Sequence, residues 1–178
     1  MTRHASLMLR LVMAALMIAT AIPARATDMP HSVASVTKGP VTERPLPRFV
    51  SIKSDKVFAR RGPSKTHRID WIYRQDNLPV EVVAEYGHWR RIRDRDGEGG
   101  WVHYALLSNT RTVIVDRAML DLHSRPSEDM PVVARLEAGV IARLDKCTPG
   151  WCRLIADGYK GWAPKVALWG VAPNEIRD

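Results

Sequence analysis

This sequence of 178 residues lacks the patterns that mark many enzymes and metalloproteins. None of its acidic residues forms a Ser-His-Asp, a His-Glu-x-x-His or a glycine-rich phosphate-binding pattern. The histidines beyond the N-terminal region have no metal-ligand spacing; they are His67, His88, His103 and His123. We therefore expect these histidines at the surface or in loops, no metal or other cofactor, and no catalytic residue.

Long apolar runs are equally scarce, because the only one spans residues 11–22. Arg3 and Arg10 precede this run, and the small residues of Pro23-Ala24-Arg25-Ala26 follow it. The pattern predicts a secretory signal peptide, residues 1–26, cleaved after Ala26. An uncleaved anchor is the alternative, but a membrane-spanning helix needs roughly 20 apolar residues. We expect an exported mature protein, periplasmic or extracellular, without a transmembrane segment.

Cysteine occurs only twice, as Cys147 and Cys152 in the stretch KCTPGWCRL. An even number of cysteines in an exported chain favours a disulfide, and Thr-Pro-Gly between them is typical of a turn. The alternatives are weaker, because two thiols are too few ligands for zinc and a nucleophilic cysteine needs a positioned base. We expect a Cys147–Cys152 disulfide that mainly pins a hairpin.

The remaining chain never sustains helical periodicity. Residues 27–47 are rich in Ser, Thr and Pro, which predicts a flexible leader. From Phe49 onward, short apolar runs are broken by turn residues every eight to twelve positions. This texture predicts an all-β fold.

Four landmarks of the first half recur in the second half at offsets of 61 to 63 positions. The pairs are Pro63 with Pro126, Trp89 with Trp151, Asp96-Gly97 with Asp157-Gly158, and Gly100-Trp101 with Gly161-Trp162. Such offsets predict two copies of a unit of about sixty residues. We place the modules at residues 48–112 and 113–172, each a small barrel of five or six strands, with a C-terminal tail at 173–178.

The landmarks also predict local structure. Asp-Gly between alternating runs is typical of a type I′ hairpin turn, in which both central residues have positive φ. Glycine before Trp indicates a bend or a close backbone approach, with the indole covering a small core. Trp101 and Trp162 are therefore expected in the cores of the two modules.

These motifs resemble the bacterial SH3-like domain. The stretches LPVEVVAEYGHWRRIRDRDGEGGWVH and CTPGWCRL, with the later GYKGW and LWG, are similar to a proteobacterial family of exported tandem SH3-like proteins of unknown function. The resemblance covers about residues 49–171 and implies two tandem small β barrels. It also implies a non-catalytic module that targets cell-wall peptides or glycans. Such domains are often attached to wall hydrolases, for which we expect no room in this chain.

Positive charge gathers in the first module. Residues 48–112 contain 13 basic and 8 acidic side chains, whereas residues 113–178 contain 9 of each. Loss of Arg3, Arg10 and Arg25 with the signal peptide lowers the formal net charge from +8 to +5. An exported basic surface meets anionic polymers and membranes, and we expect no nucleic-acid partner.

The run WRRIRDRD, residues 89–96, concentrates this charge. In a strand, alternate side chains share a face, so Arg91, Arg93 and Arg95 would lie beside Trp89, with Ile92 opposite. Guanidinium groups next to an indole suit carboxylates or phosphates. The alternative is a solvated strand face that Asp94 and Asp96 partly neutralise.

Three more aromatic residues are candidates for ligand binding. Trp151, like Trp89, opens a strand directly after a turn, where an indole face could meet a sugar or a peptide. Trp71 and Tyr73 share one parity in a short run, and at least one of them is expected in the core. We keep both as candidates.

Three functions remain open. The first is a binding module for peptidoglycan or its stem peptide. The second is an adaptor for another envelope protein, and the third is a small wall-modifying enzyme with an unfamiliar site. The sequence leaves the oligomeric state undetermined.

Overall fold

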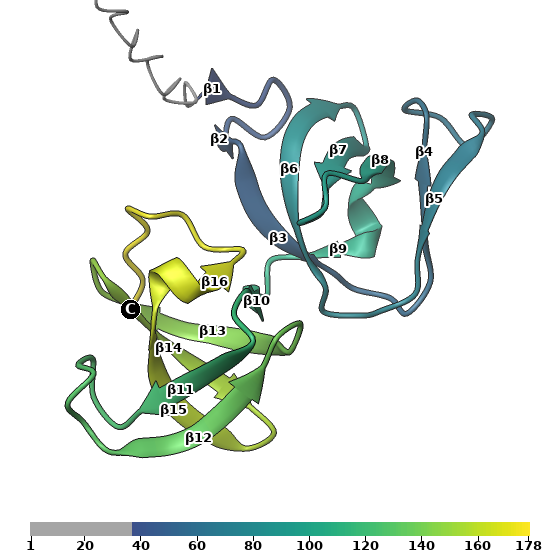
Figure 1. Cartoon of the computed structure of the whole chain (residues 1–178). Helices are drawn as coiled ribbons and strands as arrows, with labels where there is room; N and C mark the ends of the chain where they lie inside the picture. Colours follow the sequence, from purple (N-terminus) through teal and green to yellow (C-terminus); the bar gives the residue numbers. More distant parts are fainter. Residues whose placement is uncertain (1–36) are drawn as a thin grey trace, which may run out of the picture. The chain divides into compact units, whose positions relative to one another are not determined.

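The computed structural model describes residues 37–178, so the expected signal peptide and the first ten residues of the leader lie outside it. The described chain is built from strands and contains two short 3-10 helices, η1 (Tyr104–Leu106) and η2 (Lys165–Ala167). Two seven-stranded antiparallel sheets follow one another along the sequence, as Figure 1 shows. This architecture confirms the all-β, tandem SH3-like fold.

The two sheets share one topology. In the first, the order is β5-β4-β8-β7-β6-β3-β9, and in the second it is β12-β11-β15-β14-β13-β10-β16. The first sheet contains β3 (Arg48–Ile52), β4 (Val57–Arg60), β5 (Ile69–Tyr73), β6 (Pro79–Tyr86), β7 (Trp89–Arg93), β8 (Gly99–His103) and β9 (Leu107–Ser108). The second contains β10 (Thr112–Val115), β11 (Met119–His123), β12 (Val132–Glu137), β13 (Ile141–Cys147), β14 (Trp151–Ala156), β15 (Tyr159–Pro164) and β16 (Leu168–Trp169).

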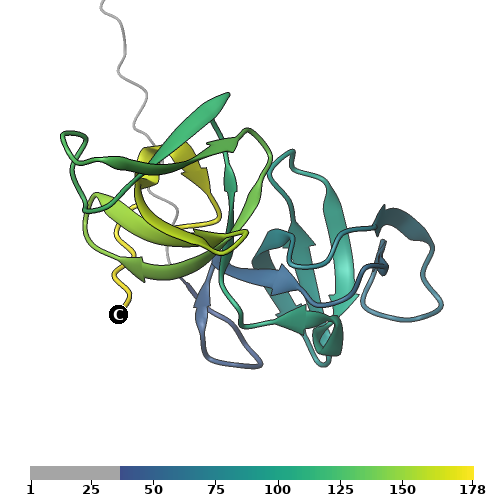
Figure 2. The same ribbon diagram turned by 90° about the horizontal axis from the view of Figure 1, so that it is seen from below.

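Each sheet curls around its own hydrophobic core, a curvature visible in the turned view of Figure 2. The first core contains Val57, Val80, Val82, Ile92 and Val102, and the second contains Val113, Leu122, Leu144, Cys152 and Leu154. Each sheet has more strands than the five or six expected, because the count of seven includes the two-residue strands β9 and β16 that follow the 3-10 helices.

The two Asp-Gly turns differ. Between β14 and β15, Asp157 and Gly158 have φ values of 48° and 83°, as a two-residue type I′ turn requires. Between β7 and β8 the expectation was wrong, because the loop is longer and only Gly97 of its Asp-Gly pair has positive φ. The side chain of Asp94 stabilises this longer loop, because its Oδ1 accepts hydrogen bonds from the backbone N–H groups of Asp96 and Glu98.

The glycines before the repeated Trp residues lie where two strands approach closely. A Cβ atom on Gly100 would lie 2.7 Å from the carbonyl oxygen of Arg60, and one on Gly161 would lie 2.7 Å from Cβ of Leu122. The close backbone approach predicted from the sequence is therefore confirmed in both modules.

The end of the expected leader is part of module 1. Thr37–Lys38 (β1) and Pro45–Leu46 (β2) form a two-stranded sheet, and Leu46 belongs to the first core. The flexible leader expected for residues 27–47 is thus wrong for residues 37–47, which we call the strap. A buried carboxylate elsewhere in module 1 binds the strap. The composition of the strap itself, rich in Ser, Thr and Pro, gives no sign of this contact.

That carboxylate is Glu85, whose side chain has no exposed surface. It accepts hydrogen bonds from the backbone N–H groups of Val41 and Thr42, the Thr42 hydroxyl and Nη2 of Arg48, the last two at 2.7 Å. Burial alone would raise the pKa of Glu85, but the hydrogen bonds from Thr42, Arg48 and Val41 outweigh it and hold the pKa at about 2.

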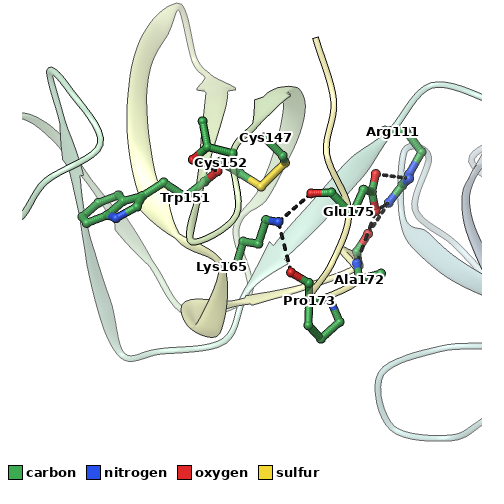
Figure 3. Close-up of a disulfide and its surroundings, with 10 residues drawn as sticks. Arg111, Cys147, Trp151, Cys152, Lys165, Ala172, Pro173 and Glu175 are labelled. Atoms are coloured by element: carbon green, nitrogen blue, oxygen red, sulfur yellow. Dashed lines mark hydrogen bonds and ion pairs between the residues drawn. A yellow bond between two sulfur atoms is a disulfide. The ribbon is translucent and has the colours of Figure 1, made fainter. Parts of the chain in front are cut away.

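The second module is tied at its far end by the predicted disulfide, shown in Figure 3. Cys147 and Cys152 are directly opposed on the β13–β14 hairpin, which confirms the predicted pairing. The C-terminal tail packs beside them. Nζ of the buried Lys165 donates to the carbonyl oxygens of Pro173 and Glu175, and the Glu175 carboxylate pairs with Arg111 at 2.6 Å.

The Glu85 network predicts a specific loss of stability in acid. The pKa of Glu85 is lowered from 4.5 to about 2, so its contribution is complete above pH 4.5 and is lost as the pH falls through about 2. The shift corresponds to roughly 3 kcal/mol. Urea unfolding at pH 7, 4 and 3 should show that Glu85→Gln loses about this amount at pH 7 and declines less steeply with acid. An equally steep decline in the variant would contradict this assignment.

The disulfide closes only a short loop, so its removal should have a moderate effect. The chain-entropy relation gives about 2 kcal/mol for a loop of this size. We expect the Cys147→Ser, Cys152→Ser double variant to remain folded and to lose about that much free energy of unfolding in urea. The wild-type protein under reducing conditions should match it, and a variant as stable as the oxidised wild type would exclude a stabilising role.

Candidate functional site

The outward face of β7 presents the residues that the sequence analysis selected. Arg91 and Arg93 are exposed and Trp89 is half-buried, whereas Ile92 between them is 2% exposed. The predicted alternation is therefore present. Arg95 lies beyond the end of β7, where its guanidinium is 3.5 Å from Asp116, so it was wrongly placed on this face.

This face borders a hollow of about 770 Å³, which we call the Arg91 groove. It is lined by residues of strands β4 to β8 and their loops, including Arg60, Arg61, Arg91, Arg93, Asp70 and Trp101. Arg91 is directly opposite Trp101 in the β7–β8 register. A guanidinium beside an indole provides both charge and a flat apolar surface.

Most of the arginines in this groove already have partners. Arg93 pairs with Glu81 at 2.5 Å, and Arg61 pairs with Asp70 at 3.1 Å. A hydrogen bond from Arg68, helped by Arg61, lowers the pKa of Asp70, so this carboxylate stays charged in weak acid. Nη1 of Arg60 donates to the carbonyl oxygen of His67.

Arg91 is the exception among these arginines. Within residues 37–178 its side chain has no ion-pair or hydrogen-bond partner, although it is exposed and lines the groove. The guanidinium therefore keeps its donors available for an anionic ligand.

Module 2 contains the same pair in a neutralised form. Arg153 is opposite Trp162 on β14 and β15, and its guanidinium lies 5.6 Å from the centre of the indole ring. Its Nε, however, donates to Asp145 at 2.7 Å, and Lys160 is 3.0 Å from the same carboxylate. Hydrogen bonds from Lys160 and Arg153 lower the pKa of Asp145, which therefore remains ionised.

One substitution between the repeats accounts for this difference. Both modules have a break in strand register, of the kind made by a β-bulge, in the strand that pairs with the arginine-bearing strand. The break lies between Val82 and Ala84 in β6 and between Leu144 and Lys146 in β13. The residue at this bulge is Val83 in module 1 and Asp145 in module 2. Val83 supplies no charge to Arg91, so the arginine of module 1 stays unpaired.

A second feature next to the groove is an aromatic cluster that the sequence analysis missed. The Trp89 ring meets His103 edge-on with 5.7 Å between centroids, and His103 stacks on Tyr104 at 4.9 Å. His88 lies 5.6 Å from Tyr104. The expectation of surface or loop histidines holds for His88, which is exposed, but is wrong for His123, which is 8% exposed in β11. The β7–β8 register places His103 opposite Trp89. That pairing was the available signal.

The other candidate residues occupy different environments. Trp151 is half-buried and packs edge-on against His123 at 5.8 Å, and Figure 3 shows its indole extending away from the disulfide. Trp71 is 40% exposed, but Tyr73 is 4% exposed and donates its hydroxyl to the carbonyl of Glu98. Tyr73 is thus the expected core member of that pair, and it has no ring face for a ligand.

Trp101 and Trp162 are not core residues, contrary to the sequence analysis. Both are half-buried and lie outside the two core clusters, on the same outward faces as Arg91 and Arg153. Neighbouring residues of a strand point to opposite faces, and Val102 points into the core. Trp101 therefore points outward, on the same face as its register partner Arg91. This placement leaves part of the Trp101 indole exposed on the outward face of module 1.

No group of three or more His, Cys, Asp or Glu side chains between residues 37 and 178 is arranged to hold a metal ion. Within the same range, no helix has the length and apolar character needed to cross a bilayer.

The comparison with protein families decides the family. The model of the bacterial SH3 domain matches twice, at residues 53–109 and 117–170, which together make up more than half of the chain. The chain belongs to the bacterial SH3 domain family. Domains of this family are generally non-catalytic modules that bind cell-wall components.

Solved structures provide weaker similarities. The structures of NlpC2 and NlpC1 from Trichomonas vaginalis are each 16% identical to the chain, with TM-scores of 0.33. The alignments cover 69% and 75% of this chain and 48% of each structure, so the chain spans about half of their length. Comparison with curated proteins finds no match.

Proposed function

We propose that this bacterial SH3 protein is an exported, non-catalytic module that binds peptidoglycan, through the stem peptide, in the cell envelope. The observation that carries the proposal is the unpaired guanidinium of Arg91 in a groove that Trp101, its partner in the strand register, also lines. Stem peptides offer carboxylates to a guanidinium and small apolar side chains to an indole. The disulfide and the family support export, and the signal peptide at residues 1–26 remains a prediction.

The difference between the modules supports a binding role for module 1. Trp89 and Trp101 would contact the ligand, Arg91 would pair with its carboxylate, and Arg93 would contribute less because Glu81 already occupies it. In module 2, Asp145 pairs with both Arg153 and Lys160, so the arginine opposite Trp162 is already engaged. A guanidinium can form two parallel hydrogen bonds with one carboxylate, and this directional pairing would favour carboxylate ligands in the groove.

A single arginine tests the proposal. We expect Arg91→Ala to weaken binding to insoluble cell-wall sacculi by about tenfold, because it removes a charged hydrogen bond. The measurement is co-sedimentation of the protein purified from the envelope at ~0.15 M salt, where the Debye length is about 8 Å and nonspecific attraction is screened. Arg153→Ala is the matched control and should change binding by less than about twofold, since its charge is already paired. Equal losses in both variants would indicate general attraction between charges.

The bulge residue offers a second test that leaves every arginine in place. Val83→Asp should supply Arg91 with the partner that Asp145 supplies to Arg153, and binding to sacculi should fall about as far as in Arg91→Ala. Asp145→Val is the reciprocal change and should leave the affinity unchanged or raise it. Thermal unfolding monitors the fold of both variants. Undiminished binding by a folded Val83→Asp protein would contradict the role of Arg91.

The adaptor function is favoured by one observation, the exposed edge strand β5. This strand ends the first sheet, and Ile69, Trp71 and Ile72 are 36–40% exposed. An apolar edge strand is a typical surface for adding a strand from a partner. If wild-type protein fails to sediment with sacculi at any salt concentration, a protein partner on β5 becomes the better interpretation.

A further inference from the structure

Module 1 contains a second hollow that shares no lining residue with the Arg91 groove. Its volume is about 370 Å³, and we call it the arginine pocket. Its walls include Arg44, Arg48, Arg90 and Tyr104, and its floor includes Val50 and Val82. Arg44 belongs to the strap, so the pocket is complete only when residues 37–47 are docked.

The arginine pocket has more positive than negative charge. The only carboxylate in contact with its arginines is Glu85, which takes Nη2 of Arg48 at 2.7 Å and lies 3.5 Å from Nε of Arg90. Nη1 of Arg44 donates to the neutral Asn109 side chain at 3.1 Å. Three guanidinium groups thus face a single carboxylate within the described residues.

Two hydrogen-bond donors of Arg48 are the main reason to expect a ligand in the arginine pocket. Its Nε and Nη1 atoms are buried and have no hydrogen-bond partner among the described residues. Buried polar groups are normally hydrogen-bonded, and a guanidinium presents Nε and Nη donors in a fork that fits two oxygens of one anion. Glu85 cannot fill this role, because it is already shared among Val41, Thr42 and Arg48.

The rest of the lining selects the kind of anion. Val82 is fully buried and Val50 is 7% exposed, so the floor is apolar. The Tyr104 ring lies under the Arg90 guanidinium at 5.9 Å and adds an aromatic wall. The volume is near the lower end of the roughly 300–1,000 Å³ of small-molecule pockets. These features suit a carboxylate attached to small apolar groups better than a phosphate, which has no apolar part.

We propose that the arginine pocket binds the C-terminal carboxylate of a short peptide whose last residues are small and apolar. Arg48 and Arg44 bind the carboxylate, and Val50, Val82 and Tyr104 contact the terminal side chain. This site is separate from the Arg91 groove, and the inference does not rest on the proposed function.

The test uses acetylated dialanine as the probe, in L and D forms, with a free carboxylate or with a C-terminal amide. Titration is followed by NMR of the purified protein, with the Tyr104 ring as reporter. We expect saturable shifts with the free acid and at least ~10-fold weaker binding of the amide, because the amide lacks the charge that the guanidinium fork recognises. Equal binding of acid and amide would overturn the proposal, as would inorganic phosphate binding as tightly as the free acid.

Three variants locate the effect. Arg44→Gln, at an exposed position, should weaken the free acid about three- to tenfold. Arg48→Lys keeps a charge for Glu85 but loses the fork, and should weaken it at least ~10-fold. Arg91→Ala removes only the cation of the Arg91 groove, so the saturable shifts of the Tyr104 ring should persist while binding to sacculi falls. If Arg91→Ala abolishes the shifts and folded Arg44→Gln does not, the probe binds in the Arg91 groove and the arginine pocket is excluded.

Discussion

The buried carboxylate of Glu85 organises one end of module 1. A charged group without exposed surface is tolerated only when hydrogen bonds and opposite charges replace its water. Here the strap supplies three hydrogen bonds and Arg48 supplies a fourth, so strand β6 and residues 37–47 must fold together. The same carboxylate positions Arg48 and Arg90, and the arginine pocket therefore depends on a group that lies beneath its surface.

Much of the fold was predictable because its signals are local or periodic. The 61–63 residue offsets, the Asp157-Gly158 turn and the Cys147–Cys152 pairing each depend on neighbouring residues or on a simple repeat. The docked strap was not predictable, because its partner Glu85 is more than forty residues away and looks like an ordinary polar residue of an alternating strand. Long-range satisfaction of a buried charge leaves no pattern in the sequence.

The candidate site was predictable only in part, for a related reason. Alternation along residues 89–93 places Arg91 and Arg93 on one face with Trp89, and this needs only the strand period. Which arginine remains unpaired depends on the register with β6 and on the residue at the bulge. Val83 and Asp145 occupy corresponding positions in the two modules. Residue spacing alone does not show that the residue at this position decides whether the neighbouring arginine is paired.

The two modules consequently divide their charges in different ways. In module 2, Arg135 and Arg153 each pair with an acidic residue. Acidic and basic side chains are also equal in number over residues 113–178. In module 1, basic residues outnumber acidic ones, and the surplus appears as the unpaired Arg91 and the half-satisfied Arg48. Duplication of one small barrel thus leaves one copy with equal numbers of acidic and basic side chains and with a disulfide across one hairpin. The other copy retains two separate positions at which an anion could complete the pairing.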